Sequence, residues 1–288
     1  MVKNSLAILL IAGALIFLYV NFNEFWPWSA SGAAKQEAKV DEGTESVKLN
    51  VSSVNTKIVP VDSDSIRVEG TKKHDIKVKE GRKSIEITIK QKGFRFFQFN
   101  SDQTTATVYL PQKYAKELQL DIGSGEIDTT AYTSSNPLIL SSVSVKMGSG
   151  DVMIGALDAK EFSYNGSSGE AVIEKLSTEN GNFNLSSGDL TVSHYEGPFK
   201  ADVSSGELNA GFTELSGEID VSVSSGDVNL DLPDNADFTL KGKVSSGDLF
   251  NEFPLDNAKM TDRVSEGTHG KGTHLIKVKV SSGDFTLY

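Results

Sequence analysis

After residue 46 the chain alternates apolar and polar residues, which is the pattern of β-strands that bury one face. Residues 47–51 read Val-Lys-Leu-Asn-Val, and residues 85–89 read Ile-Glu-Ile-Thr-Ile. The same two-residue period returns in residues 107–110, Thr-Val-Tyr-Leu, and continues towards the end of the chain. The pattern therefore predicts an all-β protein over this region.

A short motif, Ser-Gly-Asp or Ser-Gly-Glu, recurs eight times after residue 120. We call it the turn motif. Its glycines are Gly125, Gly150, Gly169, Gly188, Gly206, Gly226, Gly247 and Gly283. From the second to the seventh glycine the steps are 19, 19, 18, 20 and 21 residues. A fixed period of this length is typical of a repeat architecture.

The residues that flank the turn motif test this interpretation independently. If the motif is a turn between two strands, positions five and three before its glycine, and two and four after it, should point inward. Of these 32 positions, 28 are apolar, whereas the whole chain is 38% hydrophobic. The flanks therefore predict strand, turn, strand, with glycine supplying a positive φ in the turn.

A period near 19 residues is close to one coil of a β-solenoid. The prediction is a right-handed parallel β-helix or solenoid-like repeat domain, behind a single N-terminal transmembrane helix. Neighbouring coils would stack about 4.8 Å apart, so eight coils would form a rod of roughly 40 Å. The alternative is an antiparallel β-sandwich of the same strands.

Residues 1–28 predict a membrane anchor. Residues 6–20 are an unbroken apolar run, Lys3 precedes it, and Trp26 and Trp28 follow it. The lysine favours a cytoplasmic N-terminus, and tryptophan is typical of the membrane–water interface. A cleaved signal peptide is the alternative, because small residues that resemble a cleavage site occur further along the chain.

The rest of the chain divides into three predicted segments. Residues 29–46 are small and polar and predict a flexible linker. Residues 47–120 lack the turn motif but keep the alternation, so they predict a β-rich capping region or a small sandwich against the rod. Residues 121–288 carry the turn motifs and form the predicted Ser-Gly-Asp/Glu-repeat solenoid.

Charge and composition exclude several functions. The chain holds 28 Lys+Arg and 39 Asp+Glu, so its net charge is −11, which argues against nucleic acid as a partner. There is no cysteine, hence no disulfide framework and no cysteine zinc site. An enzyme that cleaves acidic polysaccharide would need clustered cations, and Arg263 is the only arginine after residue 120. We therefore expect no enzymatic activity, no catalytic residue and no cofactor.

The acidic residue of each turn motif would form a ladder if the coils stack in register. Like charges about 5 Å apart repel each other, and Ca²⁺ is a hard cation that binds several oxygens. A solvated turn explains the same residues without a metal. The weak candidates for a structural Ca²⁺ site are Asp151, Asp189, Asp227, Asp248 and Asp284.

Two further segments stand out. His269 and His274 lie in the longest interruption of the repeat, where a surface loop is expected and no third metal ligand has matching spacing. Residues 94–99 read Phe-Arg-Phe-Phe-Gln-Phe. Exposed, this segment would contact the membrane or a partner protein, and buried, it would be a core strand. The candidate partner-binding residues are Phe94, Phe96, Phe97 and Phe99.

Three segments carry a resemblance to a known family. Residues 106–111 read Ala-Thr-Val-Tyr-Leu-Pro, residues 118–127 enter the first turn motif, and residues 280–285 end on Val-Ser-Ser-Gly-Asp-Phe. This arrangement resembles the bacterial putative-adhesin family of β-strand-repeat proteins, and the N-terminal anchor resembles its LiaG-type members, which are associated with cell-envelope stress in Gram-positive bacteria. The resemblance implies an extracytoplasmic, non-enzymatic β-repeat domain and no functional residues.

Together these features predict a single-pass protein of the cell membrane, with a cytoplasmic N-terminus and an extracytoplasmic C-terminal domain. Its expected function is adhesin-like binding or scaffolding at the cell envelope, with a cell-wall glycan or an envelope protein as partner. One alternative is a regulatory partner that docks another membrane protein through residues 94–99 or through a free edge of the last coil at Tyr288. The other is a polysaccharide-active β-helix enzyme.

Overall fold

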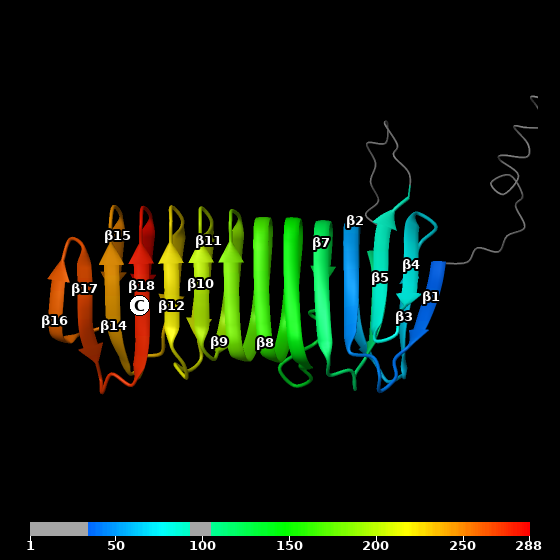
Figure 1. Cartoon of the computed structure of the whole chain (residues 1–288), viewed down its shortest axis with the longest axis horizontal. Coiled ribbons are helices and arrows are strands. Elements are labelled where there is room, and N and C mark those ends of the chain that lie inside the picture. Colours follow the sequence, from blue (N-terminus) through cyan, green and yellow to red (C-terminus); the bar gives the residue numbers. More distant parts are fainter. Residues whose placement is uncertain (1–33, 93–104) are drawn as a thin grey trace, which may run out of the picture. The chain divides into compact units, whose positions relative to one another are not determined.

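The computed structural model describes residues 34–92 and 105–288, whose regular structure is entirely β (Figure 1). The chain divides into two units, Met1–Ala33 and Ala34–Tyr288, and only the second is described. Among residues 34–92 and 105–288, no helix is long and apolar enough to cross a membrane. The predicted anchor, residues 1–28, lies outside the described residues.

The described residues form nineteen strands. They are β1 (Ala34–Lys39), β2 (Ser46–Val61), β3 (Ser65–Gly70), β4 (His74–Glu80), β5 (Ser84–Gln91), β6 (Thr105–Pro111), β7 (Glu117–Asp128), β8 (Leu138–Leu185), β9 (Asp189–Glu196), β10 (Phe199–Val203), β11 (Glu207–Phe212), β12 (Ile219–Val223), β13 (Asp227–Asp231), β14 (Phe238–Val244), β15 (Asp248–Asn251), β16 (Asp256–Thr261), β17 (Val264–His269), β18 (His274–Val280) and β19 (Asp284–Leu287).

The strands of the repeat region form two ladders that run along the domain. In the first ladder β10 lies between β8 and β12, and all three are parallel. In the second ladder β11 lies between β9 and β13, again in parallel. Each turn motif carries the chain from the first ladder to the second, so each coil contributes one strand to each ladder. The domain is therefore a β-solenoid with two strands per coil.

Burial confirms the predicted inward face. Of the 32 flanking positions, 30 are buried, and the two exceptions, Leu249 and Asn251, both lie on the short strand β15. The parallel pairing of successive coils rules out the antiparallel sandwich for the repeat region. Its right-handed turn stays a prediction.

Aromatic side chains fill the widest part of the core. The ring of Phe183 stacks on Phe199, with centroids 4.7 Å apart, and packs at 5.5 Å from Phe162. Tyr195 packs edge-on against Phe199 and Phe212, at 5.1 Å and 5.2 Å. Because these residues come from successive coils, no coil can bury its own rings, and it is the stack that folds.

The last coil in sequence is not the last coil in space. Strand β18 pairs with β12 on one side and with β14 on the other, and β19 lies likewise between β13 and β15. In chain order, β14 and β15 of the outermost coil therefore come first, and the antiparallel strands β17 and β16 follow beside β14. Strands β18 and β19 come last and insert between this coil and the coil of β12 and β13 (Figure 1). The simple expectation that coils stack in sequence order, leaving a free edge at Tyr288, is wrong.

The N-terminal strands continue both ladders. The first part of β2 pairs in parallel with β5 and β7, and its second part pairs in parallel with β6 and β7. Strands β4 and β3 then add in antiparallel fashion, β4 to β5 and β3 to β6. Residues 47–92 and 105–120 thus share the two ladders of the repeat.

One part of the predicted flexible linker is ordered. The sequence assigned residues 29–46 to a linker, whereas Ala34–Lys39 forms β1 and pairs in antiparallel fashion with β3. Only Ala38 of this strand is a buried apolar residue. The strand therefore gains its structure from pairing with β3 rather than from its own hydrophobic pattern, which is why the sequence did not reveal it.

A side chain covers the free edge of β4. The amide nitrogen of Gln36 donates to the carbonyl of Ile76 at 2.8 Å, and its amide oxygen accepts from the main-chain N–H of Val78 at 2.6 Å. These are the groups that another strand would use. Gln36 thus protects an edge that could otherwise pair with a second molecule.

Replacing Gln36 by alanine should therefore expose this edge. We expect the free energy of unfolding to fall by about 1–2 kcal/mol, because the carbonyl of Ile76 and the N–H of Val78 lose their partner. We also expect concentration-dependent self-association, measured by analytical ultracentrifugation. Glu37→Ala, an exposed neighbour on the same strand, is the matched control and should change neither quantity. Equal behaviour of the two variants would contradict this role for Gln36.

Candidate functional site

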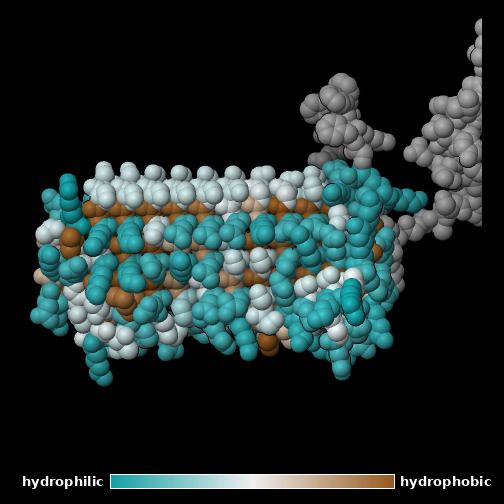
Figure 2. Space-filling view, in the orientation of Figure 1, coloured by the Kyte–Doolittle hydropathy of each residue, from teal (hydrophilic) through white to brown (hydrophobic). Residues whose placement is uncertain are grey.

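The turn motifs stack into a continuous ridge, which we call the serine–glycine ridge. Main-chain bonds join its turns: the N–H groups of Ser224 and Ser225 donate to Val203 and Ser204 of the preceding coil, at 2.8 Å and 2.7 Å. Figure 2 shows the ridge as a pale band along one margin of the domain. The ridge presents small, hydroxyl-bearing residues at a constant spacing.

Close approach explains why every turn motif has glycine. A Cβ on Gly169 would lie 2.0 Å from the carbonyl oxygen of Gly150, and one on Gly226 would lie 2.2 Å from that of Gly206. Gly169 has φ of +91°, whereas Gly226 does not lie in the left-handed region. The predicted need for a positive φ therefore holds for only part of the set. The need for space beside the preceding coil holds throughout.

The acidic residues of the turn motifs do form a ladder, which we call the acidic ladder. Asp189 lies beside Glu207, which lies beside Asp227. Asp284 follows next, and Asp248 comes last because the final coil is intercalated. At the other end Asp151 pairs with Glu126. All five candidate metal-binding aspartates, Asp151, Asp189, Asp227, Asp248 and Asp284, are exposed.

The acidic ladder offers one carboxylate per coil. Among the described residues, no group of three or more His, Asp or Glu side chains is arranged to hold a metal ion. Ca²⁺ takes six to eight oxygens, which a single file of exposed carboxylates does not converge to supply. Structural calcium stays a prediction that rests on the register of the ladder alone.

A degenerate ninth turn motif, without glycine or an acid, precedes the eight Ser-Gly-Asp/Glu motifs. Residues 51–55 read Val-Ser-Ser-Val-Asn. Gly125 stacks on Val54, and Asn55 donates to the carboxylate of Glu126 at 3.0 Å. The sequence search missed this coil because it required glycine and an acid. The flanking Val-Ser-Ser was the signal that could have revealed it.

Polar residues on the outer faces repeat from coil to coil. The amide of Asn229 donates to the side-chain oxygen of Asn209 at 2.9 Å, and Asn184 donates likewise to Asn165 at 3.1 Å. On the face in view, Figure 2 shows polar rows as teal bands parallel to the ridge. The face therefore presents the same donors and acceptors at a regular, rigid spacing.

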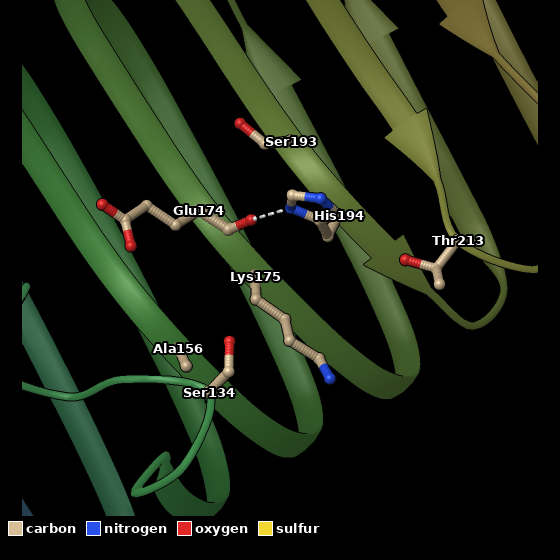
Figure 3. Close-up of a pocket in the computed structure, with 7 residues that line it drawn as sticks. All are labelled: Ser134, Ala156, Glu174, Lys175, Ser193, His194 and Thr213. Atoms are coloured by element: carbon tan, nitrogen blue, oxygen red, sulfur yellow. Dashed lines mark hydrogen bonds between the residues drawn. The ribbon is translucent and has the colours of Figure 1, made fainter.

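A hollow of about 410 Å³ lies where the strands of the second ladder bulge, and we call it the His194 hollow. Ser193 and His194 are both exposed, so the alternation breaks there, and Lys175 of β8 lies beside His194 in register. The hollow is lined by Ser134, Ala156, Glu174, Lys175, Ser193, His194 and Thr213 (Figure 3). No sequence motif indicated this hollow, because a bulge depends on pairing between coils.

The His194 hollow lacks the contacts of a catalytic site. The Nδ1 atom of His194 lies 3.0 Å from the main-chain carbonyl of Glu174, and this is the one side-chain hydrogen bond among the residues that line the hollow. The carboxylate of Glu174 and the hydroxyl of Ser193 point away from the imidazole (Figure 3). A nucleophile, a base and an orienting acid are therefore not in contact among the residues that line the hollow.

The loop between His269 and His274 is held in place by hydrogen bonds to Asp237. Thr273 donates to Asp237 from its main-chain N–H at 3.0 Å and from its hydroxyl at 2.9 Å. The first of these bonds contributes most to holding the pKa of Asp237 below its usual range. The ring of His269 packs against Phe238, and its Nδ1–H donates to the main-chain carbonyl of Pro254 at 2.9 Å. His269 thus contributes to packing.

The predicted partner-binding segment cannot be placed among these features. Phe94, Phe96, Phe97 and Phe99 fall within residues 93–104, which lie outside the described residues. Their assignment to a partner or to the core stays a prediction.

Comparison with known proteins identifies a family and a fold. A family model described as Toastrack DUF4097 matches residues 44–288. A crystal structure of a putative adhesin from Parabacteroides distasonis ATCC 8503 has a TM-score of 0.56 and 14% identity, covering 90% of this chain and 98% of its own. A putative adhesin from Parabacteroides merdae ATCC 43184 has a TM-score of 0.50 and 12% identity, with the same coverage. No curated protein matches the chain. At these identities the two structures show the fold alone.

Proposed function

Because the chain belongs to the Toastrack DUF4097 family, we propose that it is a membrane-anchored, extracytoplasmic binding or scaffold module of the bacterial cell envelope, without enzymatic activity. The anchor is the apolar run of residues 6–20, and the positive charge of Lys3 places the N-terminus in the cytoplasm. The LiaG-type resemblance adds a context of envelope stress in Gram-positive bacteria.

One observation supports binding above all: the outer faces repeat the same polar groups from coil to coil. The asparagine pairs and the acidic ladder keep their register across coils that lie about 4.8 Å apart. A rigid array of this kind matches an extended ligand with its own repeat, because each further contact is made at little extra entropic cost. The ligand we propose is therefore a polymer of the envelope rather than a small molecule.

The geometry gives no support to the enzyme alternative. In the His194 hollow the imidazole bonds to main chain and not to a hydroxyl or a carboxylate. Polysaccharide-cleaving β-helices need an acid and a base at a defined separation on either side of a bond. The acidic ladder is a single exposed row, which does not enclose a substrate.

Binding is tested by sedimentation of the full-length protein, kept in an uncharged detergent, with protein-free cell-wall material. We expect the protein to sediment with the wall and the supernatant to gain no sugar or phosphate. Asn209→Ala with Asn229→Ala should weaken binding, whereas Ser134→Ala, in the His194 hollow, should not. Protein that stays in the supernatant would contradict binding, and release of soluble fragments would contradict the absence of enzymatic activity.

Topology is tested separately on intact cells. Protease added outside should degrade the β-solenoid, while an epitope fused before Lys3 should survive until the cells are lysed. Protection of the solenoid in intact cells would overturn the proposed extracytoplasmic location.

A further inference from the structure

Four lysines form a compact array on the outer face of the first ladder, and we call it the lysine lattice. Lys277 and Lys279 lie on β18, and their register partners on β14 are Lys241 and Lys243. All four are exposed, because they alternate with buried residues of the same strands. Neighbouring lysines are about 4.8 Å apart across the strands and about 6.6 Å apart along them.

The lattice exists only because the last coil is intercalated. Residues 241–243 and 277–279 are far apart in sequence, and they become neighbours because β18 inserts between β12 and β14. If β14 had stacked directly on β12, the lysines of β14 would lie beside Asp220 and Ser222 instead. The chain order of the coils therefore creates a concentration of positive charge in a protein of net charge −11.

Nearby acids do not neutralise the lattice. Lys277 forms an ion pair with Asp220 at 3.8 Å, and Glu266 lies in register between Lys241 and Lys259. Among the described residues, no ion pair is formed by Lys241, Lys243 or Lys279. Like charges directly opposite each other on a sheet are destabilising, so a bound anion would relieve this repulsion.

At the other end of the same face the lysines are matched. Lys48 forms an ion pair with Asp121 at 2.7 Å and lies beside Glu86 in register, and Lys146 lies beside Asp121, so two lysines face two carboxylates. The lysine lattice, at the end that holds β14 and β18, thus differs in having four neighbouring cations with fewer acids beside them. The asymmetry points to an anionic ligand at that end.

We propose that the lysine lattice binds a linear phosphodiester polymer, which deepens the proposed function by naming the chemistry of the ligand. The next outward residues along the two strands are the exposed Ser245 and Ser281, whose hydroxyls can also donate to phosphate oxygens. Lysine acts on phosphate as a point charge, whereas the planar arginine that pairs with carboxylates in bidentate fashion is absent from the lattice. A polymer, rather than a single anion, can contact all four ammonium groups at once.

Bilayer headgroups also carry phosphate, but a polymer is the occupant we assign, because a linear chain of phosphates can follow the neighbouring strands and contact the four lysines in turn. The lattice lies on β14 and β18, at the end of the solenoid opposite to β1 (Figure 1). Binding to headgroups is an outcome of the test below that would overturn this assignment.

The test measures binding of a fluorescent synthetic glycerol phosphate oligomer to the full-length protein in uncharged detergent, at several salt concentrations. We expect the quadruple variant Lys241→Gln, Lys243→Gln, Lys277→Gln and Lys279→Gln to bind at least about 30-fold more weakly, because each surface lysine contributes several-fold. The slope of log K against log salt should fall in magnitude by about 3, as four phosphate contacts are lost. All four positions are exposed and their mutual repulsion is removed, so the temperature of thermal unfolding should not fall.

The matched control carries the same change of charge elsewhere on the solenoid: Lys116→Gln, Lys146→Gln, Lys160→Gln and Lys175→Gln. It should bind within about twofold of the wild type, since screening limits the reach of distant charges. Equal losses in both variants would overturn the lattice as a site. Tighter binding to polygalacturonate, or lattice-dependent binding to phosphatidylglycerol vesicles as tight as that of the oligomer, would overturn the assigned ligand.

These outcomes separate the inference from the proposed function. If the wild type binds wall material but the quadruple variant binds it equally well, the lattice is not the site and the binding function stands. If the wild type binds neither wall material nor the oligomer, both proposals fail.

Discussion

Replacing Gly226 by alanine is expected to lower the free energy of unfolding by about 3 kcal/mol. The new Cβ would lie 2.2 Å from the carbonyl oxygen of Gly206 and 2.8 Å from a methyl carbon of Val203. That carbonyl accepts the N–H of Asp227 at 3.0 Å, so it cannot retreat without loss of a bond between coils. Overpacking against fixed backbone costs about this much. Urea unfolding of the full-length protein, followed by circular dichroism, measures the loss.

The control is a glycine that has room, two residues before the glycine of the first turn motif. A Cβ on Gly123 would meet only the carbonyl of Val51 at 3.8 Å and the hydroxyl of Ser52 at 3.9 Å. Gly123→Ala should change the free energy of unfolding by less than about 0.5 kcal/mol. A similar loss in Gly123→Ala and Gly226→Ala would contradict the close approach to Gly206 as the cause of the loss at Gly226.

This pair of variants bears on what the sequence could predict about the turns. A positive φ and a close approach of backbone both select glycine, so the motif alone could not distinguish them. Gly188 has φ of +85° and would also meet the carbonyl of Gly169 at 2.3 Å, so both reasons apply there. For Gly226 only the second reason applies. The stack of coils, which the sequence does not contain explicitly, decides between them.

The inward faces and the register of the coils were predictable because they follow from a two-residue period and from equivalent residues in each coil. The order of the last coils was not predictable, because the same equivalence makes the coils interchangeable as neighbours. Coils with the same pattern offer nearly equivalent edges, so β18 can pair with β12 as well as β14 can. Only the connection through β16 and β17 decides which coil is placed outermost.

The candidate sites also differ in whether they follow from one position of the repeat or from contacts between coils. The acidic ladder was predictable, because its residues occupy one position of the repeat. The His194 hollow was not, since it needs bulges in neighbouring coils to coincide. The lysine lattice was also missed, because it depends on a coil order that places Lys241 beside Lys277. Features made by the repeat are visible in the sequence, and features made by departures from it are not.

Removing residues 274–288 is expected to unfold the C-terminal end of the solenoid, although these residues are last in the chain. They contribute five side chains that are at most 2% exposed, namely Ile276, Val278, Val280, Phe285 and Leu287. Burial of this size contributes on the order of 10 kcal/mol before entropic costs. Strands β14 and β15 would lose their partners β18 and β19, so amide exchange should become fast throughout residues 238–269.

The same experiment shows whether the coil order is correct. If the coils stacked in sequence order, the truncation would remove only an outer coil, and residues 238–269 would stay protected on β12 and β13. In the intercalated order they lose protection, while residues 142–230 keep theirs because nearest-neighbour contacts hold each coil. The buried substitution Val278→Asp should reproduce the loss in the full-length chain. The exposed neighbour Lys279→Asp should not, which separates a lost coil from a lost charge.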